Sequence, residues 1–421
     1  MRLLTDLYLS AFLLVLGALW GLLFVYFRRP LLSFWREPML QVPVFILESD
    51  DWGAGPESQV DALNRLADLL SQFTDHVGKS PVMTLGIALA IPDGPKIAAG
   101  RLASYYPLPL SSPRFAALRE ALAKGVALQV FAPQLHGMEH YWPPAILAAA
   151  KSDAAVANWL TQPAPQPTES LPAHLQSRWV DASTLPSRPI PKHLIEAAVT
   201  MEIAEFRAAF GFKPEVAVPP TFLWNDELEQ AWARHGVHFL VTPGARYCSR
   251  DAQGGLVSDR NTIVNGQQGQ NGITYLVRDD YFEPARGHRA HQAIAAVACK
   301  ASLGRPALLE MHRFNFIAET QGRESAFDEL RKLLSGLIPA LPNVRFMSTL
   351  ELARHIAQRS PELVETRIRQ RIRFWLNRIN EIPRFRKLAL LSGLVIPLKL
   401  LDLVAGRPDI AVTPVLMGTP P

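Results

Sequence analysis

The sequence predicts an α/β fold, built as a barrel of parallel β-strands with helices between them. Short apolar runs rich in β-branched and aromatic residues alternate with amphipathic stretches from residue 41 to residue 358. About eight such strand–helix units fit into this length, which is the usual size of a parallel barrel. Hydrophobic residues make up 48% of the chain and charged residues 19%, which is typical of folded proteins and excludes a disordered chain.

The individual elements follow from apolar periodicity and from capping residues. Strands are predicted at residues 42–48, 82–90, 126–131, 215–218, 237–241, 273–277, 307–311 and 344–347. Helices are predicted at residues 59–73, 112–124, 193–210, 226–234, 288–301, 325–337 and 350–358, with Ser112 and Asn225 as N-caps. Residues 141–191 are rich in Pro, Gln, Ser and Thr and predict a long excursion with little regular structure, and residues 261–271 predict a loop.

The first 40 residues predict a membrane anchor. Residues 7–27 carry no charge and are long enough, at about 1.5 Å per residue, to cross a hydrocarbon core of about 30 Å. A cleaved signal peptide is the alternative, but Arg28-Arg29-Pro30 follows where a small-residue cleavage site is expected. Together with Arg36, these arginines favour a cytoplasmic location for the main domain, while a periplasmic location stays open.

The tail, residues 359–421, carries the excess of positive charge. Residues 361–421 hold ten Lys and Arg against five Asp and Glu, which equals the net charge of +5 for the whole chain. The main body is therefore neutral, and we expect no nucleic-acid partner. Arginines interleave with apolar residues at 367–379, which is typical of a membrane-surface helix, although a helix packed on the domain is the alternative. Residues 388–404 are apolar but interrupted by Pro397, Lys399 and Asp402, which favours an interfacial or re-entrant segment.

Three stretches place acids or histidines at the carboxyl ends of predicted strands. Asp50 and Asp51 follow the first strand, His136 and His140 follow the strand at 126–131, and His312 follows the strand at 307–311. Buried carboxylates are costly unless they are paired or hold a cation. Taken singly, each stretch has an ordinary alternative: a turn cap for the acids, a surface helix for the histidine pair and a satisfied core histidine for His312. Because barrel enzymes build their sites at the carboxyl ends of their strands, the shared position predicts one catalytic site.

These residues resemble the polysaccharide deacetylase family, which is related to chitin deacetylases, and most closely a divergent bacterial branch. The likeness covers residues 42–352 and implies a distorted (β/α) barrel of that type. It also implies that Asp50 is the general base, that Asp51, His136 and His140 ligate a divalent metal, and that His312 is the general acid. Zinc is the metal that this set of ligands favours, with cobalt, nickel and iron left open. The bacterial branch further implies an inner-membrane location.

The sequence departs from the family pattern in its supporting residues. The family carries an Arg before a Pro-rich turn, where this chain has Val218, so Asp50 lacks its expected partner. Arg278 and Arg313 are the candidates to replace that Arg. The stretch 278–284 resembles another site-facing loop without an assigned role. Residues beside the motifs are predicted to bind substrate: Trp52, Glu48, Pro220, Trp224, Arg313 and Asn315.

The sequence therefore predicts a metal-dependent hydrolase that removes an N-acyl (acetyl) group from an amino sugar. The substrate is expected to be a surface polysaccharide or a lipid-linked glycan, because both chain ends have a membrane composition. A catalytically inactive, membrane-tethered glycan-binding protein is one alternative. A glycoside hydrolase is another, and it requires a second carboxylate, for which Glu48, Glu139 and Glu310 are candidates. Cys248 and Cys299 show no metal-ligand spacing, and the sequence does not determine the oligomeric state.

Overall fold

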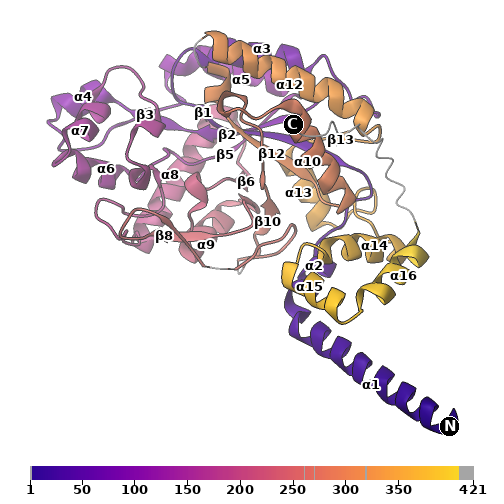
Figure 1. The fold of residues 1–421 in the computed structure, drawn as a ribbon. Coiled ribbons are helices and arrows are strands. Elements are labelled where there is room, and N and C mark those ends of the chain that lie inside the picture. Colours follow the sequence, from indigo (N-terminus) through magenta and orange to yellow (C-terminus); the bar gives the residue numbers. More distant parts are fainter. Residues whose placement is uncertain (1, 260, 270, 318–319, 407–421) are drawn as a thin grey trace.

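The protein folds around one curled parallel sheet, shown in Figure 1. The structure is a computed structural model that describes residues 2–259, 261–269, 271–317 and 320–406. Neighbouring strands of the sheet are all parallel. Their spatial order is β10 (Thr274–Val277), β7 (Phe239–Thr242), β6 (Val216–Ala217), β5 (Phe131–Leu135), β2 (Met83–Ala88), β1 (Val44–Gly53), β12 (Ala307–His312) and β11 (Asp280–Tyr281), with β13 (Arg345–Phe346) paired to the start of β1.

The two edges of the sheet are joined by a very short connection. β10 lies at one edge and ends at Val277, and β11 lies at the other edge and begins at Asp280. Because consecutive Cα atoms are 3.8 Å apart, three peptide links hold these two residues within about 11 Å of each other. The sheet therefore curls until its edges nearly meet. This shape fits the predicted barrel of parallel strands, with a gap where Arg278 and Asp279 cross between the edges.

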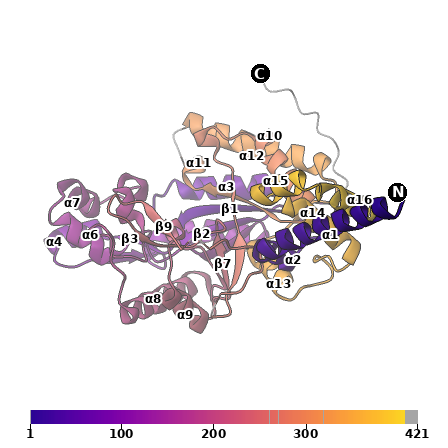
Figure 2. The same cartoon turned by 60° about the horizontal axis from the view of Figure 1, so that its bottom comes forward.

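Helices surround the curled sheet and are seen above and below the strands in Figure 2. They are α3 (Gln59–Leu70), α5 (Ala116–Ala127), α8 (Lys192–Phe210), α9 (Asp226–His235), α10 (Ala290–Ser302), α12 (Thr320–Ala340) and α13 (Thr349–Ala357), with the short α11 (Phe314–Ile317) before α12. The predicted helices are found within a few residues of these bounds. Capping residues explain several of the starts, since the side chains of Asn225 and Ser348 accept hydrogen bonds from the first turns of α9 and α13.

Alternation along the strands separates apolar from polar positions inside the barrel. On β1, Val44 and Ile46 belong to a buried apolar cluster, and Glu48 and Asp50 follow at the same two-residue spacing. On β12, the residues that point to the same face are Leu308, Glu310 and His312, again two positions apart. The interior is therefore apolar toward the amino ends of the strands and ionisable toward their carboxyl ends.

The predicted strand at residues 126–131 is wrong. Helix α5 continues to Ala127, and the strand is β5, Phe131–Leu135. Gly125 explains the tight reversal, because a β-carbon there would lie 1.9 Å from the ring of Phe131. Helix and strand therefore pack closer than a larger side chain at Gly125 allows, and the apolar run that resembles one strand is shared between the two.

The excursion at residues 141–191 has more regular structure than expected. It contains α6 (Pro143–Ala150), α7 (Ala154–Thr161) and two short 3-10 helices, Thr168–Ser170 and Ala173–Gln176. Tyr141, Ile146 and Trp159 belong to a separate apolar core that also includes Ile97 from α4 (Gly94–Ala99). The prolines lie at helix starts and between helices, where they are compatible with helix formation.

Two antiparallel hairpins were also not predicted: β3 (Ala90–Pro92) with β4 (Pro107–Pro109), and β8 (Tyr247–Arg250) with β9 (Leu256–Ser258).

The two ends of the chain are helical. The N-terminal helices are α1 (Arg2–Tyr26) and α2 (Arg28–Arg36), and the C-terminal helices are α14 (Ile368–Ile379), α15 (Pro383–Leu391) and α16 (Val395–Ala405). Among the described residues, no single helix has the length and apolarity of a membrane span, whereas two bent helix pairs do. These pairs are Ser10–Tyr26 with Arg28–Arg36 and Pro383–Leu391 with Val395–Ala405. Residue 1 of the predicted anchor, residue 270 of the predicted loop and residues 407–421 of the predicted tail lie outside the described residues.

Candidate active site with a metal-ligand triad

An irregularity in β1 turns two neighbouring carboxylates toward one site. Successive residues of a regular strand point to opposite faces, so Asp50 and Asp51 would normally be separated. The register of β1 on β2 shifts between Ser49 and Trp52, and Asp51 has a φ of 71°. A bulge of this kind adds a residue to one strand and redirects its side chain. Both carboxylates therefore line the same cavity although they are adjacent in sequence.

The two histidines come from the turn that follows β5. Gly137, with a φ of +92°, permits the chain to turn sharply directly after His136. Nδ1 of His136 donates a hydrogen bond to the backbone carbonyl of Val218 at 2.8 Å. Because a carbonyl can only accept, this bond fixes the proton on Nδ1 and leaves Nε2 free to bind a metal. The backbone of Val218, the position where the expected Arg is absent, thus orients a predicted metal ligand.

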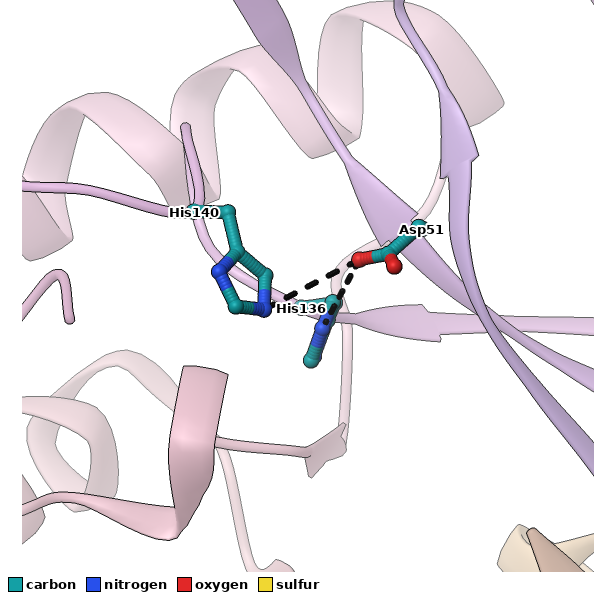
Figure 3. A group of neighbouring side chains, drawn as sticks. All are labelled: Asp51, His136 and His140. Atoms are coloured by element: carbon teal, nitrogen blue, oxygen red, sulfur yellow. Dashed lines mark ion pairs between the residues drawn. The ribbon is translucent and has the colours of Figure 1, made fainter. Parts of the chain in front are cut away.

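Asp51, His136 and His140 form a compact set of ligand atoms (Figure 3). The Nε2 atoms of His136 and His140 lie 3.5 Å and 3.8 Å from Oδ1 of Asp51. All three ligand atoms lie within 4.8 Å of one another, as expected around a single ion. Nε2 of His136 is buried without a hydrogen-bond partner, as suits an atom that binds a cation. Two imidazoles and one carboxylate, with positions left open, are the donor set of a catalytic zinc-type site.

The protonation states of the triad suit cation binding at two of its three positions. Burial lowers the pKa of His140 to about 4, so its imidazole is neutral near pH 7. Burial opposes ionisation of Asp51, but the imidazole of His136 at 3.5 Å and the nearby His140 and His312 hold its pKa well below the ordinary value. For His136, the carboxylates Asp50 and Asp51 outweigh burial and raise the pKa, so an arriving cation displaces a proton there.

Arg278 supports Asp50 from the gap between the sheet edges. Its guanidinium donates to Oδ2 of Asp50 at 2.6 Å and to Oε2 of Glu48 at 2.8 Å, and its Nε lies 3.1 Å from Oε2 of Glu310. Only 1% of the Arg278 side chain is exposed. Burial would raise the pKa of Asp50, but Arg278 lowers it below the ordinary value and keeps the carboxylate ionised. The structure thus selects Arg278 over Arg313 as the partner of Asp50.

His312 ends β12, in register with Asp50 on the neighbouring strand β1, and is paired with Glu283. Its Nδ1 lies 2.5 Å from Oε1 of Glu283, and the second carboxylate oxygen of Glu283 accepts a hydrogen bond from Asn315. Burial lowers the pKa of His312, but Glu283, Asp50 and Asp51 raise it to about 9. The imidazole therefore carries its proton at neutral pH, which is the form required of a general acid. Phe314 stacks on the ring of His312, with centroids 5.8 Å apart.

All five residues of the predicted reaction centre line one cavity of about 200 Å³. The remaining wall comes from the excursion, from the turn after β6 and from loops near β11 and β12: Thr168, Glu169, Gln176, Val218, Pro219, Thr221, Phe222, Arg278, Arg286, Glu310 and Phe314. A volume of this size is small for a ligand pocket, which typically measures about 300–1,000 Å³. It fits an acyl group with its neighbouring atoms rather than a whole oligosaccharide.

The residues predicted to bind substrate lie around the cavity rather than on its wall. Trp52 and Trp224 are 0% exposed in the core, and Glu48, also 0% exposed, pairs with Arg278. Asn315 supports Glu283, and Pro220 is buried in a 3-10 turn (Pro220–Phe222) whose other residues reach the cavity. Arg313 lines a smaller neighbouring cavity together with Asp51 and His140. Trp52 and Trp224 therefore pack in the core, and the substrate-binding role of these six residues stays a prediction.

Glu283 and Gly86 are the site residues without a predicted role. Glu283 lies in the stretch 278–284, whose resemblance to a site-facing loop indicated that it lies near the site. The sequence did not show which residue of the stretch acts there. Gly86 gave no signal, because a glycine within a strand usually marks only a weak position. In the structure, a β-carbon at Gly86 would lie 2.2 Å from Oδ1 and 3.0 Å from Cγ of Asp50.

Gly86→Ala is therefore expected to push the Asp50 carboxylate out of place. We expect kcat/KM to fall roughly 10-fold to 100-fold, because small misplacements of a reacting group have effects of this size. Metal content is expected to stay unchanged, since Gly86 contacts Asp50 and not the triad. Gly100→Ala is the control, because its β-carbon meets nothing closer than 3.4 Å. Wild-type kinetics in Gly86→Ala would contradict the expected displacement.

Comparisons with known proteins give similarities among solved structures alone. No family model matches the chain, and no curated protein matches it. A family 4 acetyl xylan esterase from Clostridium thermocellum, in complex with a cobalt ion, is 11% identical to this chain, with a TM-score of 0.35. The match covers 73% of this chain and 89% of the esterase chain. The peptidoglycan deacetylase PdaC from Bacillus subtilis is 12% identical with a TM-score of 0.34, covering 76% and 95%.

A 4-alpha-glucanotransferase from Thermococcus litoralis is 11% identical with a TM-score of 0.38. It covers 75% of this chain, which spans only 40% of the glucanotransferase. At these identities and TM-scores the similarities decide neither activity nor substrate. A putative polysaccharide deacetylase from Mycobacterium smegmatis, 13% identical with a TM-score of 0.37, is also similar and covers 77% of this chain and 93% of its own length.

Proposed function

We propose that this protein is a metal-dependent hydrolase that removes an N-acyl group, normally acetyl, from an amino sugar of a surface or lipid-linked polysaccharide. One observation carries the proposal. The three candidate ligands, the ionised carboxylate of Asp50 and the protonated imidazole of His312 all line the same small cavity. Such an arrangement supplies a metal site, a general base and a general acid for hydrolysis of an amide.

The residues divide the reaction between them. A divalent ion held by Asp51, His136 and His140 would polarise the acyl carbonyl and lower the pKa of a water molecule. Asp50, fixed by Arg278, accepts a proton from the water that attacks the carbonyl carbon. His312, fixed by Glu283, donates a proton to the nitrogen as the bond between carbon and nitrogen breaks. The products are a carboxylate, such as acetate, and a free amino sugar.

The protein's own geometry disfavours the glycoside hydrolase alternative. Of the three candidate acids, Glu48 and Glu139 are buried and pair with Arg278 and Arg178. Glu310 lines the cavity and burial raises its pKa, but Oε2 of its carboxylate is held 3.1 Å from Nε of Arg278. Asp50 also lines the cavity and keeps Oδ1 without a hydrogen-bond partner, so we assign the acid–base pair to Asp50 and His312. The second alternative, an inactive glycan-binding protein, is distinguished from a hydrolase by measuring metal content and hydrolysis together.

The deciding experiment measures metal content and hydrolysis on the same purified full chain. After addition of zinc, we expect about one ion per chain by elemental analysis and release of acetate from N-acetylated oligosaccharides. Asp50→Asn is expected to keep the ion and to lower kcat about 10²-fold to 10⁴-fold, since it removes a general base. A protein that binds the ion but hydrolyses no N-acylated glycan would be a binding protein. A protein that binds no ion would disprove the proposed mechanism.

The pH profile tests the role of Glu283. Because Glu283 helps to raise the pKa of His312 to about 9, the protonated acid is available below that pH and is lost above it. Glu283→Gln removes the negative charge and is expected to move the alkaline limb of kcat/KM to lower pH, by roughly one unit or more. The measurement is kcat/KM between neutral and alkaline pH, with metal content followed in parallel. An unchanged limb would exclude His312 as the general acid controlled by Glu283.

A further inference from the structure

The two ends of the chain form a single helical unit, here called the terminal unit: α1, α2, α14, α15 and α16. Phe27 and Leu31 from the N-terminal helices share a buried apolar core with residues from the C-terminal helices, namely Leu376, Ile379, Phe385, Ala389 and Leu394. The indole of Trp20 also donates to the carbonyl of Ser392 at 3.0 Å. Figure 1 shows this unit at one end of the molecule, with α1 projecting away from the barrel.

Buried ionic contacts fix the terminal unit to the amino ends of the strands. Arg378 of α14 is 0% exposed and donates to backbone carbonyls on both sides of the junction, at Phe34, Glu37, Pro38, Leu303 and Gly304. The carboxylate of Glu37 pairs with Arg305 at 2.9 Å. Glu37 precedes β1 and Arg305 precedes β12 in sequence. The unit is therefore attached rigidly beneath the barrel, at the end opposite to the active site.

The outer surface of the terminal unit is strongly apolar. On α1, the exposed fraction is 62% for Phe12, 75% for Leu14 and 66% for Leu22. On α15 and α16, Leu391, Leu403 and Val404 are exposed by 75%, 76% and 74%. Other large apolar side chains that are exposed on these helices are Tyr8, Leu13, Val15, Leu19, Val25, Tyr26, Leu388, Leu390, Ile396, Leu400 and Leu401. Large exposed apolar patches mark contact with a partner or a membrane, because soluble monomers rarely expose them.

The helices of the terminal unit also carry exposed positive charge. Their exposed cations include Arg28, Arg29, Arg36, Arg369, Arg384, Arg386, Lys387 and Lys399. Among the described residues, Arg384, Arg386 and Lys387 make no salt bridge. Acidic residues are few here, and Glu381 already pairs with Arg305 at 2.6 Å. Apolar helices that also carry unpaired cations match a lipid bilayer whose headgroups are anionic.

We propose that the terminal unit binds an anionic lipid bilayer and holds the active site facing away from it. Paired residues run along β1 and β12 from Phe45 and Ala307 to Asp50 and His312. Five residues at about 3.3 Å each place the reaction centre about 17 Å beyond the amino ends of these strands. This second part rests on the proposed function. It implies that the acylated sugar lies along a glycan that extends from the membrane, and not directly at a lipid headgroup.

Vesicle flotation with the full chain tests binding to the bilayer. We expect the wild type and Asp50→Asn to float equally with vesicles of phosphatidylcholine and phosphatidylglycerol. The triple variant Arg384→Gln/Arg386→Gln/Lys387→Gln is expected to lower the partition coefficient about 100-fold, since each cation near an anionic surface contributes about 1 kcal/mol. The matched control Lys151→Gln/Lys192→Gln/Lys213→Gln removes the same charge from exposed positions outside the terminal unit and is expected to bind as the wild type.

Two results of this experiment would overturn the proposal. One is the absence of flotation with either neutral or anionic vesicles. The other is self-association without lipid that is lost in Leu390→Ser/Leu391→Ser/Leu403→Ser/Val404→Ser, because the apolar surface would then bind a second copy of the chain. These four residues are 63–76% exposed, so the substitutions leave the core intact.

The orientation of the site is tested with vesicle-bound substrates. An N-acetylated oligosaccharide is attached to a lipid through either a short or a long linker. With vesicles intact, we expect hydrolysis of the long-linker substrate to exceed that of the short-linker substrate at least 10-fold, and equal hydrolysis once detergent dissolves the vesicles. Equal rates on intact vesicles would overturn the orientation. No hydrolysis in detergent would instead disprove the proposed function and leave the flotation result independent.

Discussion

The double variant His136→Ala/His140→Ala is expected to bind no divalent ion and to lose hydrolysis by roughly 10³-fold or more. The physical reason is that only Asp51 of the three candidate ligands remains, and one carboxylate does not hold a catalytic ion. A metal ion contributes several kcal/mol of transition-state stabilisation, which corresponds to a rate change of this size. Metal content by elemental analysis and acetate release, measured on the same preparation, check both parts of the expectation.

Two exposed histidines provide the matched control. His193 at the start of α8 and His291 in α10 are exposed and lie outside the cavity. The variant His193→Ala/His291→Ala removes the same two imidazoles and is expected to retain both the ion and the activity. If the variant at positions 136 and 140 kept its ion, the triad would not be the metal site. If it lost the ion but kept full hydrolysis, the reaction would not depend on the metal.

Arg278→Met is expected to destabilise the fold by about 3–5 kcal/mol. The guanidinium compensates three buried carboxylates, Glu48, Asp50 and Glu310, and methionine leaves their charges unpaired in the barrel. The free energy of unfolding from urea titration of the full chain gives the size of the effect. The stability of Arg278→Lys is expected to lie between those of the wild type and Arg278→Met. One ammonium group keeps the positive charge but cannot reach three separate carboxylates in the geometry of the guanidinium.

The pH dependence distinguishes lost charge compensation from lost packing. Without Arg278, burial raises the native-state pKa values of the three carboxylates, so the native state binds more protons than the unfolded state between the two sets of values. Stability of Arg278→Met is then expected to increase as pH falls below neutral, approaching that of the wild type. A deficit that stays constant with pH would indicate packing instead. Arg354→Met, which breaks an exposed pair with Glu215, is the control and should change stability by less than about 1 kcal/mol.

Local patterns in the sequence were sufficient for most of the barrel. Alternating apolar runs predict β1, β2, β7, β10 and β12 within a few residues, since buried parallel strands consist of short stretches of β-branched and aromatic residues. They failed at β5, because the apolar residues of 126–135 are divided between the end of a helix and the start of a strand. They also failed in 141–191, where the content of proline concealed two helices with their own core.

The sequence by itself determined which groups carry the proposed chemistry. Asp50, Asp51, His136, His140 and His312 each follow or end an apolar run, and the carboxyl ends of parallel strands meet at one edge of the sheet. The sequence also determined the apolar and basic character of both chain ends. These conclusions depend on residue type and short spacing, which are fully present in the linear chain.

Only the tertiary structure decided how these groups are supported. The bulge at Asp51, the crossing of Arg278 between the sheet edges and the contact of Glu283 with His312 bring together residues from β1, from the crossing after β10 and from the turn after β11. Likewise, packing of α2 against α14 joins segments more than 300 residues apart into the terminal unit. Such pairings arise because closure of the sheet and burial of apolar faces choose partners by shape and charge, and no short window of sequence contains both partners.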